Sequence, residues 1–389
     1  MSDALRTIPE SRIVELASRF IAWPSEQTEL MEADPAVRGF VERCVRPLID
    51  AHGLQSSIDP AGNLHVLAGP EGAPLELAVV TYAMTHPRST MENPFSAEII
   101  KHDGVSSIRG RGVSEQKGAM AAALAAFLDV AADKQLASRI AFVVLTAGET
   151  GRHDAIAQAL AAMPEAPHCA ILAVGTNGQI SLGNRGRLDI EVTIRGKAAH
   201  SSTPWAGRDV TVGVAAVLQA AQRLSSTLGA GGELGPATLT CTAIRTWPEA
   251  THTVQSEARM VFDRRLLAEE DADRVFEEIA AVFRASCDLD VDVMRGPFMH
   301  GCAIDRGSAF IQFVEQALAR SGRTPPLYYY ARMSLDAGYL AKNGVPAVMW
   351  GPGDPEQFHT VDESVRVEQL VAAARAYRLV FAAAAGGPA

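Results

Sequence analysis

The chain has 389 residues, of which 48% are hydrophobic and 21% are charged, and its formal net charge is -10 at pH 7. This length exceeds what one hydrophobic core usually organises, so we expect two domains. The acidic balance argues against nucleic acid and anionic membranes as partners. The sequence shows neither a signal-peptide pattern nor an apolar stretch of membrane-spanning length, so we expect a cytoplasmic protein.

The first half of the chain shows alternating helix and strand patterns. Apolar residues at helical spacing predict helices over residues 11–20 and 34–52. Short apolar runs then predict strands on both sides of a helix rich in small residues, which favours an α/β layer structure with a mostly parallel sheet. The predicted strands are residues 64–68, 77–81, 140–146 and 170–174, and the predicted helix is 118–132.

The pattern changes near residue 183 to the order β-α-β-β-α-β, which is typical of a ferredoxin-like unit. It returns to the first type after residue 301, where a helix, a strand and a helix follow. We therefore predict a discontinuous α/β domain of residues 1–185 and 299–389, with an inserted ferredoxin-like α+β lid or dimerisation domain of residues 186–298. The inserted elements are expected at 188–194, 210–226, 237–244, 257–264, 271–285 and 289–294, and the later ones at 308–321, 347–351 and 367–384.

A series of short motifs follows one order along the chain. They are NPF (93–95), GRGVSEQKGAMAA (110–122), LTAGETG (145–151), GKAAHSSTPWAGRD (196–209), VFDRR (261–265), SLDA (334–337) and GPGDPEQFHTVDE (351–363). Each motif alone is weak, but their order and spacing are specific. Over about residues 77–370 the chain resembles the zinc-dependent aminoacylase, acetylornithine deacetylase, succinyl-diaminopimelate desuccinylase and glutamate carboxypeptidase family. The resemblance implies a two-domain, homodimeric hydrolase.

In that family two zinc ions, held by histidines and carboxylates, polarise an amide carbonyl and activate a shared water. The resemblance places Tyr82 and Val174 where the family has ligands, and Met84 where it has an aspartate near the first ligand. Neutral tyrosine is a rare ligand and methionine a soft one, so neither replaces what is lost. Glu115 replaces the bridging aspartate, and His359 is retained. We expect no cofactor, or one zinc or other divalent metal at most.

One acid remains where the family has a pair of glutamates, and its role is open. Read without a gap into residues 152–155, Glu149 occupies the metal-ligand position and Gly148 replaces the general base. Read back from residues 146–147, Glu149 is the base and Thr150 replaces the ligand. The residual metal candidates are Glu115, Glu149 and His359, and a rebuilt single-metal site could add His86.

Other family positions are retained in the inserted domain. His200 matches a histidine that crosses the dimer interface and stabilises the oxyanion of the partner subunit's substrate. Arg265 matches an arginine that grips a substrate carboxylate, for which a planar fork is suited. His252 replaces the family's asparagine. We expect substrate contacts at Arg265, His252, His359, Asp336 and Gly351.

We therefore predict a peptidase-like hydrolase that acts on an amide-type bond, cyclic or activated, of a small carboxylated substrate without the family's two-zinc centre. Glu149 would be the general base and His200 would stabilise the oxyanion. Three alternatives stay open: a non-catalytic ligand-binding homologue, a metal-independent lyase or isomerase, and a metallohydrolase with a rebuilt single-metal site. The predicted catalytic residues are Glu149, His200, Glu115, Tyr82 and His86.

Overall fold

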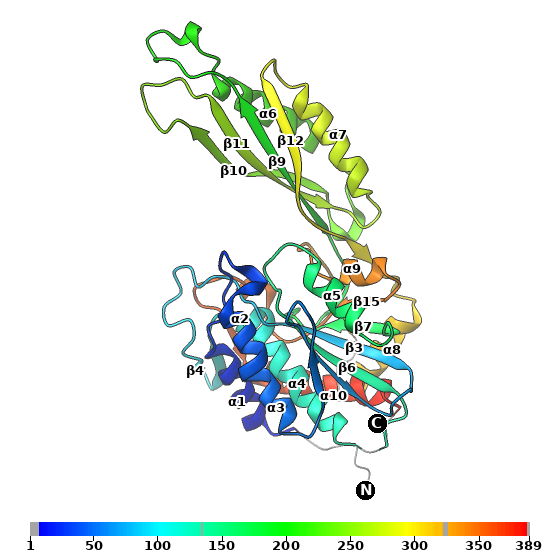
Figure 1. Cartoon of the computed structure of the whole chain (residues 1–389). Coiled ribbons are helices and arrows are strands. Elements are labelled where there is room, and N and C mark those ends of the chain that lie inside the picture. The colour runs from blue at the N-terminus through cyan, green and yellow to red at the C-terminus, as the bar shows by residue number, and fades with distance from the viewer. Residues whose placement is uncertain (1–7, 134, 322–325, 387–389) are drawn as a thin grey trace. The chain divides into compact units, whose positions relative to one another are not determined.

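The computed structural model describes residues 8–133, 135–321 and 326–386 (Figure 1). The chain divides into two compact units, and the second contains Asn184–Ala303 and Tyr330–Gly338. The first unit contains the remaining described residues. The second unit therefore includes a short segment beyond the predicted insert, because Tyr330 packs against the small apolar cluster of Leu234, Ala237 and Leu267.

The central sheet of the first unit is mostly parallel, which confirms the predicted fold class. Its strand order is β1-β2-β6-β3-β7-β15-β8. The four strands β6, β3, β7 and β15 pair in parallel, whereas β1, β2 and β8 pair antiparallel at the two sides. Parallel strands that are covered on both faces have continuous apolar sequences, as in β3 and β6. The bounds are β1 Ser56–Ile58, β2 Leu64–Ala68, β3 Leu75–Tyr82, β6 Arg139–Leu145, β7 Cys169–Leu172, β8 Ile180–Asn184 and β15 Ala347–Met349.

Helices α4 (Gly118–Ala131) and α10 (Val367–Ala384) pack against each other and against the sheet. The alanine-rich sequence of α4 lets backbones approach closely, and nearly all of its residues are buried. Among the described residues no helix is long and apolar enough to cross a membrane. The other helices are α1 Glu10–Ile21, α2 Pro35–Gly39, α3 Arg46–Asp50, α5 Asp154–Ala162, α8 Ala309–Arg320 and α9 Ala337–Lys342.

A smaller three-stranded sheet has the order β16-β5-β4 and was not predicted. Its strands β4 (Glu98–His102) and β5 (Val105–Arg109) form a hairpin, and β16 (Ser364–Arg366) pairs with β5. Asp103 and Gly104 form the hairpin turn with φ angles of 49° and 80°. An Asp-Gly pair favours such a turn, so this hairpin had a readable signal. Two short strands, β13 (Cys302–Ala303) and β14 (Tyr328–Ala331), lie where the chain passes between the units.

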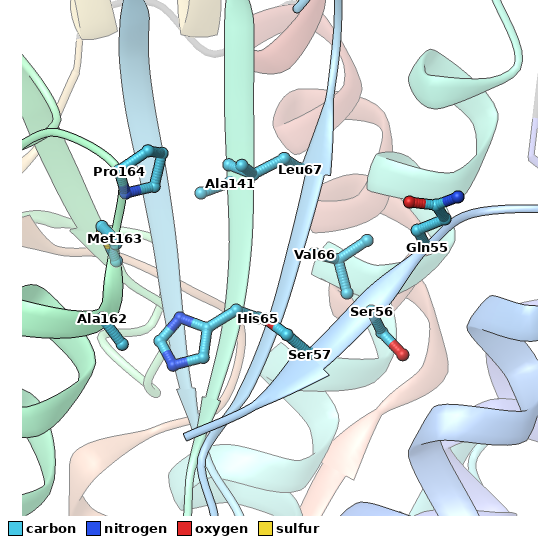
Figure 2. Close-up of a pocket in the computed structure, with 10 residues that line it drawn as sticks. All are labelled: Gln55, Ser56, Ser57, His65, Val66, Leu67, Ala141, Ala162, Met163 and Pro164. Atoms are coloured by element: carbon cyan, nitrogen blue, oxygen red, sulfur yellow. The ribbon is translucent and has the colours of Figure 1, made fainter. Parts of the chain in front are cut away.

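A pocket of about 310 Å³ is bordered by β1, β2 and the end of α5 (Figure 2). His65 lies in its wall and its Nε2 is 3.0 Å from Asp59 Oδ2. The pocket borders the first half of β6 at Ala141. None of the predicted site residues lines this pocket. Glu149, the predicted base or ligand, follows the opposite, carboxyl end of β6.

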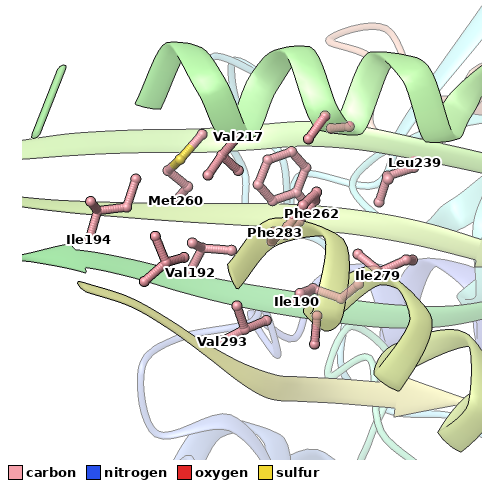
Figure 3. Packing of buried hydrophobic residues seen from close by; sticks show 14 of the residues in the cluster. Ile190, Val192, Ile194, Val217, Leu239, Met260, Phe262, Ile279, Phe283 and Val293 are labelled. Atoms are coloured by element: carbon pink, nitrogen blue, oxygen red, sulfur yellow. The ribbon is translucent and has the colours of Figure 1, made fainter. Parts of the chain in front are cut away.

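The second unit has the predicted ferredoxin-like order. Its sheet runs β10-β11-β9-β12 with every pair antiparallel. Every second residue of β11 is buried, and the apolar ones among them pack with residues of the two helices (Figure 3). The rings of Phe262 and Phe283, for example, are 4.8 Å apart. The bounds are β9 Gly186–Arg195, α6 Val210–Ser225, β10 Thr238–Trp247, β11 Glu257–Leu266, α7 Ala272–Arg284 and β12 Asp290–Met299.

Candidate active site

Three polar side chains from distant segments meet at the carboxyl end of the parallel strands. Glu149 follows β6, Glu115 lies in the π-helical turn η4 (Val113–Lys117), and His359 follows the short helix η7 (Pro355–Gln357). One ligand atom from each lies within 4.8 Å of the others. His359 Nε2 is 3.3 Å from Glu115 Oε1 and 3.7 Å from Glu149 Oε1. The structure thus brings together the residual metal candidates that the sequence named.

The turn that carries Glu115 depends on glycine. Gly112 has a φ of 77°, and a Cβ there would lie 2.4 Å from Thr85 Cγ2. The left-handed backbone lets the chain enter η4 at this point. π-Helical turns often occur at functional sites, and this one carries Glu115.

His86 joins this group through its ring. It lies in the loop beyond the end of β3 and stacks on His359, with ring centroids 3.8 Å apart and planes 20° apart. Its Nδ1 lies 2.9 Å from Pro87 O. A carbonyl only accepts, so Nδ1 carries the hydrogen and the neutral ring presents its lone pair at Nε2. Burial, followed by the positive charge of His359, lowers the pKa of His86.

The electrostatics show how closely the three groups interact. Burial, and then the charge of Glu149, raises the pKa of Glu115 to about 8. The hydrogen bonds to Glu115 and Glu149 raise the pKa of His359 to about 10. Burial and Glu149 thus favour the protonated form of Glu115, while the two glutamates favour the charged form of His359.

The donor set suits one divalent cation. Two carboxylates and an imidazole are ligands that zinc and related ions bind. Glu115 Oε2 is buried and has no hydrogen-bond partner, a costly arrangement that a cation would relieve. Within the described ranges this is the one cluster of three or more such side chains close enough to share an ion. The expectation that no cofactor is needed is therefore not supported.

Three of the departures from the family pattern, Tyr82, Met84 and Val174, are buried. Tyr82 ends β3 with 2% of its surface exposed, Met84 follows with 0%, and Val174 lies after β7 with 3%. Because the three side chains are a phenol, a thioether and an alkyl group, these positions supply no carboxylate or imidazole to the group around Glu115. Tyr82, predicted as catalytic, is thus a core residue at the strand end, and its catalytic role stays a prediction.

The residues predicted to act from the inserted domain lie in the second unit. His200 and His252 are exposed, with ring centroids 6.1 Å apart. The Arg265 fork holds Asp263 of its own unit, with Nε–Oδ1 at 2.7 Å and Nη2–Oδ2 at 3.0 Å. A substrate carboxylate would therefore compete with Asp263 for this fork. The substrate roles of these residues stay predictions.

Asp336 and Gly351, also expected at the substrate, are buried. A Cβ on Gly351 would lie 2.5 Å from Val174 O, so this glycine permits a close backbone approach. Its N–H donates to Thr176 Oγ1 at 3.1 Å. Gly351 thus has a packing role beneath the site, and its substrate role stays a prediction.

Sequence reasoning missed two buried charges under the site. Arg111 Nη1 is 3.0 Å from Glu363 Oε2, and both side chains are fully buried. Both residues lie inside quoted motifs, GRG and HTVDE, but neither was singled out. Each motif contains a charged residue to which the resemblance assigns no catalytic role, and this could have marked Arg111 and Glu363 as a structural pair.

Most of the chain matches one family of known proteins. Residues 84–383 match the peptidase family M20/M25/M40. The chain belongs to this family. This M20-family protein is 28% identical over 347 residues to the succinyl-diaminopimelate desuccinylase of Methylorubrum extorquens, which covers 82% of this chain and 83% of that protein. The membership confirms the predicted family and supports the peptidase or amidohydrolase class.

Solved structures of the M20 family share the fold. An M20 family metallo-carboxypeptidase of Sulfolobus solfataricus aligns with a TM-score of 0.79 and 16% identity, over 99% of this chain and 100% of that one. A dinuclear metal-binding M20 peptidase of Bacillus subtilis aligns with a TM-score of 0.66 and 15% identity, over 96% and 97% of the two chains. At these identities the likeness concerns the fold alone.

Proposed function

We propose that this M20-family protein hydrolyses an amide-type bond of a small carboxylated substrate with the help of one divalent cation. Glu115 and His359 would hold the cation, and Glu149 would be either a third ligand or the general base beside it. The observation that carries the proposal is their meeting within 4.8 Å, together with the buried and unpartnered Glu115 Oε2. Such a group is costly in a folded protein unless a ligand completes it.

One cation is preferred to two because of the side chains that surround the group. Tyr82 and Val174 occupy positions where the family has metal ligands, and Met84 replaces an aspartate near the first of them. All three are buried, and two of them offer no hard donor atom. The single-metal alternative is therefore favoured over the metal-independent one, and the two-zinc centre is not expected.

When bound, a divalent cation polarises a carbonyl oxygen and lowers the pKa of water. The remaining steps fall to the side chains. His86, neutral because its pKa is lowered, presents Nε2 as a proton acceptor beside the group. If Glu149 serves as a ligand, His86 is the base; if Glu149 is the base, His86 positions His359 by stacking. His200 of the partner subunit would stabilise the oxyanion.

The substrate class rests on relatives and on one retained residue. The relative named as a succinyl-diaminopimelate desuccinylase supports an amide-type bond in a carboxylated substrate. Arg265 would bind that carboxylate, and it is 27% exposed. A substrate carboxylate could take the place of the Asp263 carboxylate on the Arg265 guanidinium. Arg265 would then make two hydrogen bonds to a carboxylate both with and without substrate.

The experiment combines metal analysis with turnover. Purified protein is dialysed, its metal content is measured, and hydrolysis of a panel of N-acyl and N-succinyl amino acids is followed before and after chelation. We expect about one tightly held cation per chain, activity that chelation removes, and recovery on adding Zn²⁺, Mn²⁺ or Co²⁺.

The other outcomes decide among the alternatives. Two tightly held ions would contradict the single-metal site. Turnover that survives complete removal of metal would support the metal-independent hydrolase instead. A bound cation without turnover on any amide of the panel would favour the non-catalytic homologue.

A further inference from the structure

Two of the proposed ligands come from segments far apart in the chain. Glu115 and His359 are separated by 244 residues, yet their side chains lie 3.3 Å apart. The distance depends on how the two turns that carry these side chains are placed relative to each other. What joins the two turns therefore determines the geometry of the group.

Glu363 makes the first joint. Its Oε2 accepts from Arg111 Nη1 at 3.0 Å and from the N–H of Gly112 at 2.8 Å. Its Oε1 accepts from the N–H of Ser114 at 3.0 Å and of Glu115 at 3.2 Å. One carboxylate thus holds the whole turn that carries Glu115, including that residue's own N–H.

Ser114 makes the second joint on the other side of His359. Its Oγ donates to Asp354 O at 3.0 Å and accepts from Asp354 N–H at 2.8 Å. Asp354 precedes His359 in the chain and Glu363 follows it. The segment with the histidine is therefore fastened to the Glu115 turn at both ends.

The Arg111–Glu363 pair is an expensive way to stabilise a fold. Both side chains are 0% exposed, so the folded chain bears the full cost of removing two charges from water. Well-packed apolar residues in such places are often equally stabilising or more so. A charged pair with four directed hydrogen bonds does what apolar packing cannot, because it fixes the orientation of the turn.

We propose that Arg111 and Glu363 are positioning residues that hold Glu115 against His359 and so set the cation affinity of the site. The inference rests on the proposed function, since it presupposes a cation. Partners that orient metal ligands in this way typically change metal affinity by about 10- to 100-fold when they are removed.

The test uses Co²⁺ as the probe on the full chain. Glu363→Gln keeps the shape and removes the charge, whereas Glu363→Asp keeps the charge and withdraws the carboxylate by one carbon–carbon bond. The matched control is Glu270→Gln, since Glu270 Oε1 pairs with the buried Arg264 at 2.5 Å and Oε2 accepts from Leu267 N–H at 2.7 Å. Calorimetry gives the affinity, and the visible spectrum of Co²⁺ reports the ligand geometry.

We expect about 10- to 100-fold weaker binding and an altered spectrum for Glu363→Gln, with wild-type behaviour for Glu270→Gln. A folded Glu363→Gln with wild-type affinity and spectrum would overturn the inference and leave the proposed function standing. A wild type that binds no Co²⁺ would overturn the cation site and this inference with it.

Should Glu363→Gln fail to fold, Glu363→Asp decides the matter. Weaker Co²⁺ binding by folded Glu363→Asp supports the positioning role, and wild-type binding contradicts it. Failure of both variants to fold, beside a folded Glu270→Gln, would make the pair a folding element and refute the role in positioning.

Discussion

Glu149 can serve as a general base or as a metal ligand, and the two roles predict different metal contents. Its Oε1 lies 3.7 Å from His359 Nε2, and its side chain is 16% exposed. Glutamine keeps the shape but cannot take up a proton or supply a charged ligand atom. Glu149→Gln should therefore lower kcat by about a hundredfold or more with little change in the thermal melt.

Metal analysis of the same variant separates the roles. If Glu149 is a base, Glu149→Gln keeps the metal content of the wild type. If Glu149 is a ligand, the variant loses the cation. Glu149 also lies near the start of α5, where an acid can simply stabilise a helix N-terminus. A variant that is slightly less stable but fully active would show that this is its only role.

Lys117 provides a pH-dependent test of a buried charge. Burial lowers its pKa to about 7, whereas an unfolded lysine titrates near about 10.4. Between these values the unfolded state binds more protons, so the free energy of unfolding should rise with pH. Relative to Lys117→Met, the wild type should gain up to about 1.4 kcal/mol per pH unit across this window.

Urea unfolding of both proteins near about pH 7 and pH 9 measures this difference. Groups that do not interact with Lys117 titrate equally in the two proteins and cancel, whereas the pKa of the Cys44 thiol is lowered by the charge of Lys117 and rises when the lysine is replaced. The Nζ of Lys117 donates to Trp23 O at 2.7 Å, and it can do so with or without the extra proton. Equal pH dependence in the two proteins would mean that the lysine keeps its proton in the core.

The sequence identified the residues of the site through motifs, but not their relations. Glu115, Glu149 and His359 were candidates because each falls on a family position. Two features of Glu115 depend on how distant turns meet, which no local pattern encodes: its unpartnered Oε2, and the hydrogen bond that its backbone N–H donates to Glu363 Oε1. Gly148 is similar: a Cβ there would lie 2.2 Å from Met84 O, a contact invisible in the sequence.

At the scale of elements, periodicity located the longest helices and most of the buried strands, but it missed helix α5 and the fully buried strand β8. α10 and β2 have the predicted bounds, because apolar spacing alone defines them. The short strands β1, β4, β5 and β16 were missed because few of their residues are buried. The π-helical turns η3 (Phe40–Val45) and η4 were also missed, since their hydrogen-bond pattern has no sequence period of its own.

The core of the second unit gives a prediction about stability. Phe283 of α7 is 0% exposed and its ring lies 4.8 Å from that of Phe262. Truncation leaves a cavity between helix and sheet, so Phe283→Ala should cost about 3–5 kcal/mol. Val282 on the same helix is 36% exposed, and Val282→Ala should change stability by about 0.5 kcal/mol or less.

Urea unfolding followed by circular dichroism measures both variants. The difference between neighbours on one helix removes any effect of helix propensity at that place. Equal losses for the two variants would contradict the core shown in Figure 3.

At the scale of the whole molecule, one edge of the second unit carries an unusual apolar surface. β10 is an edge strand that pairs only with β11 among the described strands. Residues 242–245 of β10 are exposed in succession, so both faces of the strand are open there. Ile244 is 46% exposed, and Val212 of α6, the helix that packs against β10, is 67% exposed. Open edge strands invite pairing with another chain.

We therefore expect a homodimer that uses β10 and α6 of each subunit. Such an interface places each β10 strand against its own copy across a two-fold axis. Two-fold dimers are the commonest soluble oligomers. His200 belongs to this unit and is exposed, as a residue that acts in the partner's site must be. Light scattering of the wild type at micromolar concentration should show the mass of two chains.

Ile244→Lys should shift the protein to monomers, because a charge would be buried between the two edge strands. The control is Met294→Lys on β12, the opposite edge strand, where the methionine is 51% exposed and lies outside the proposed interface. Monomers formed by Ile244→Lys should also lose turnover if His200 acts across the interface, while they keep the cation held by Glu115, Glu149 and His359. A monomeric wild type would contradict the dimer and reduce His200 to a surface residue. A dimer that Met294→Lys breaks and Ile244→Lys does not would move the interface to β12.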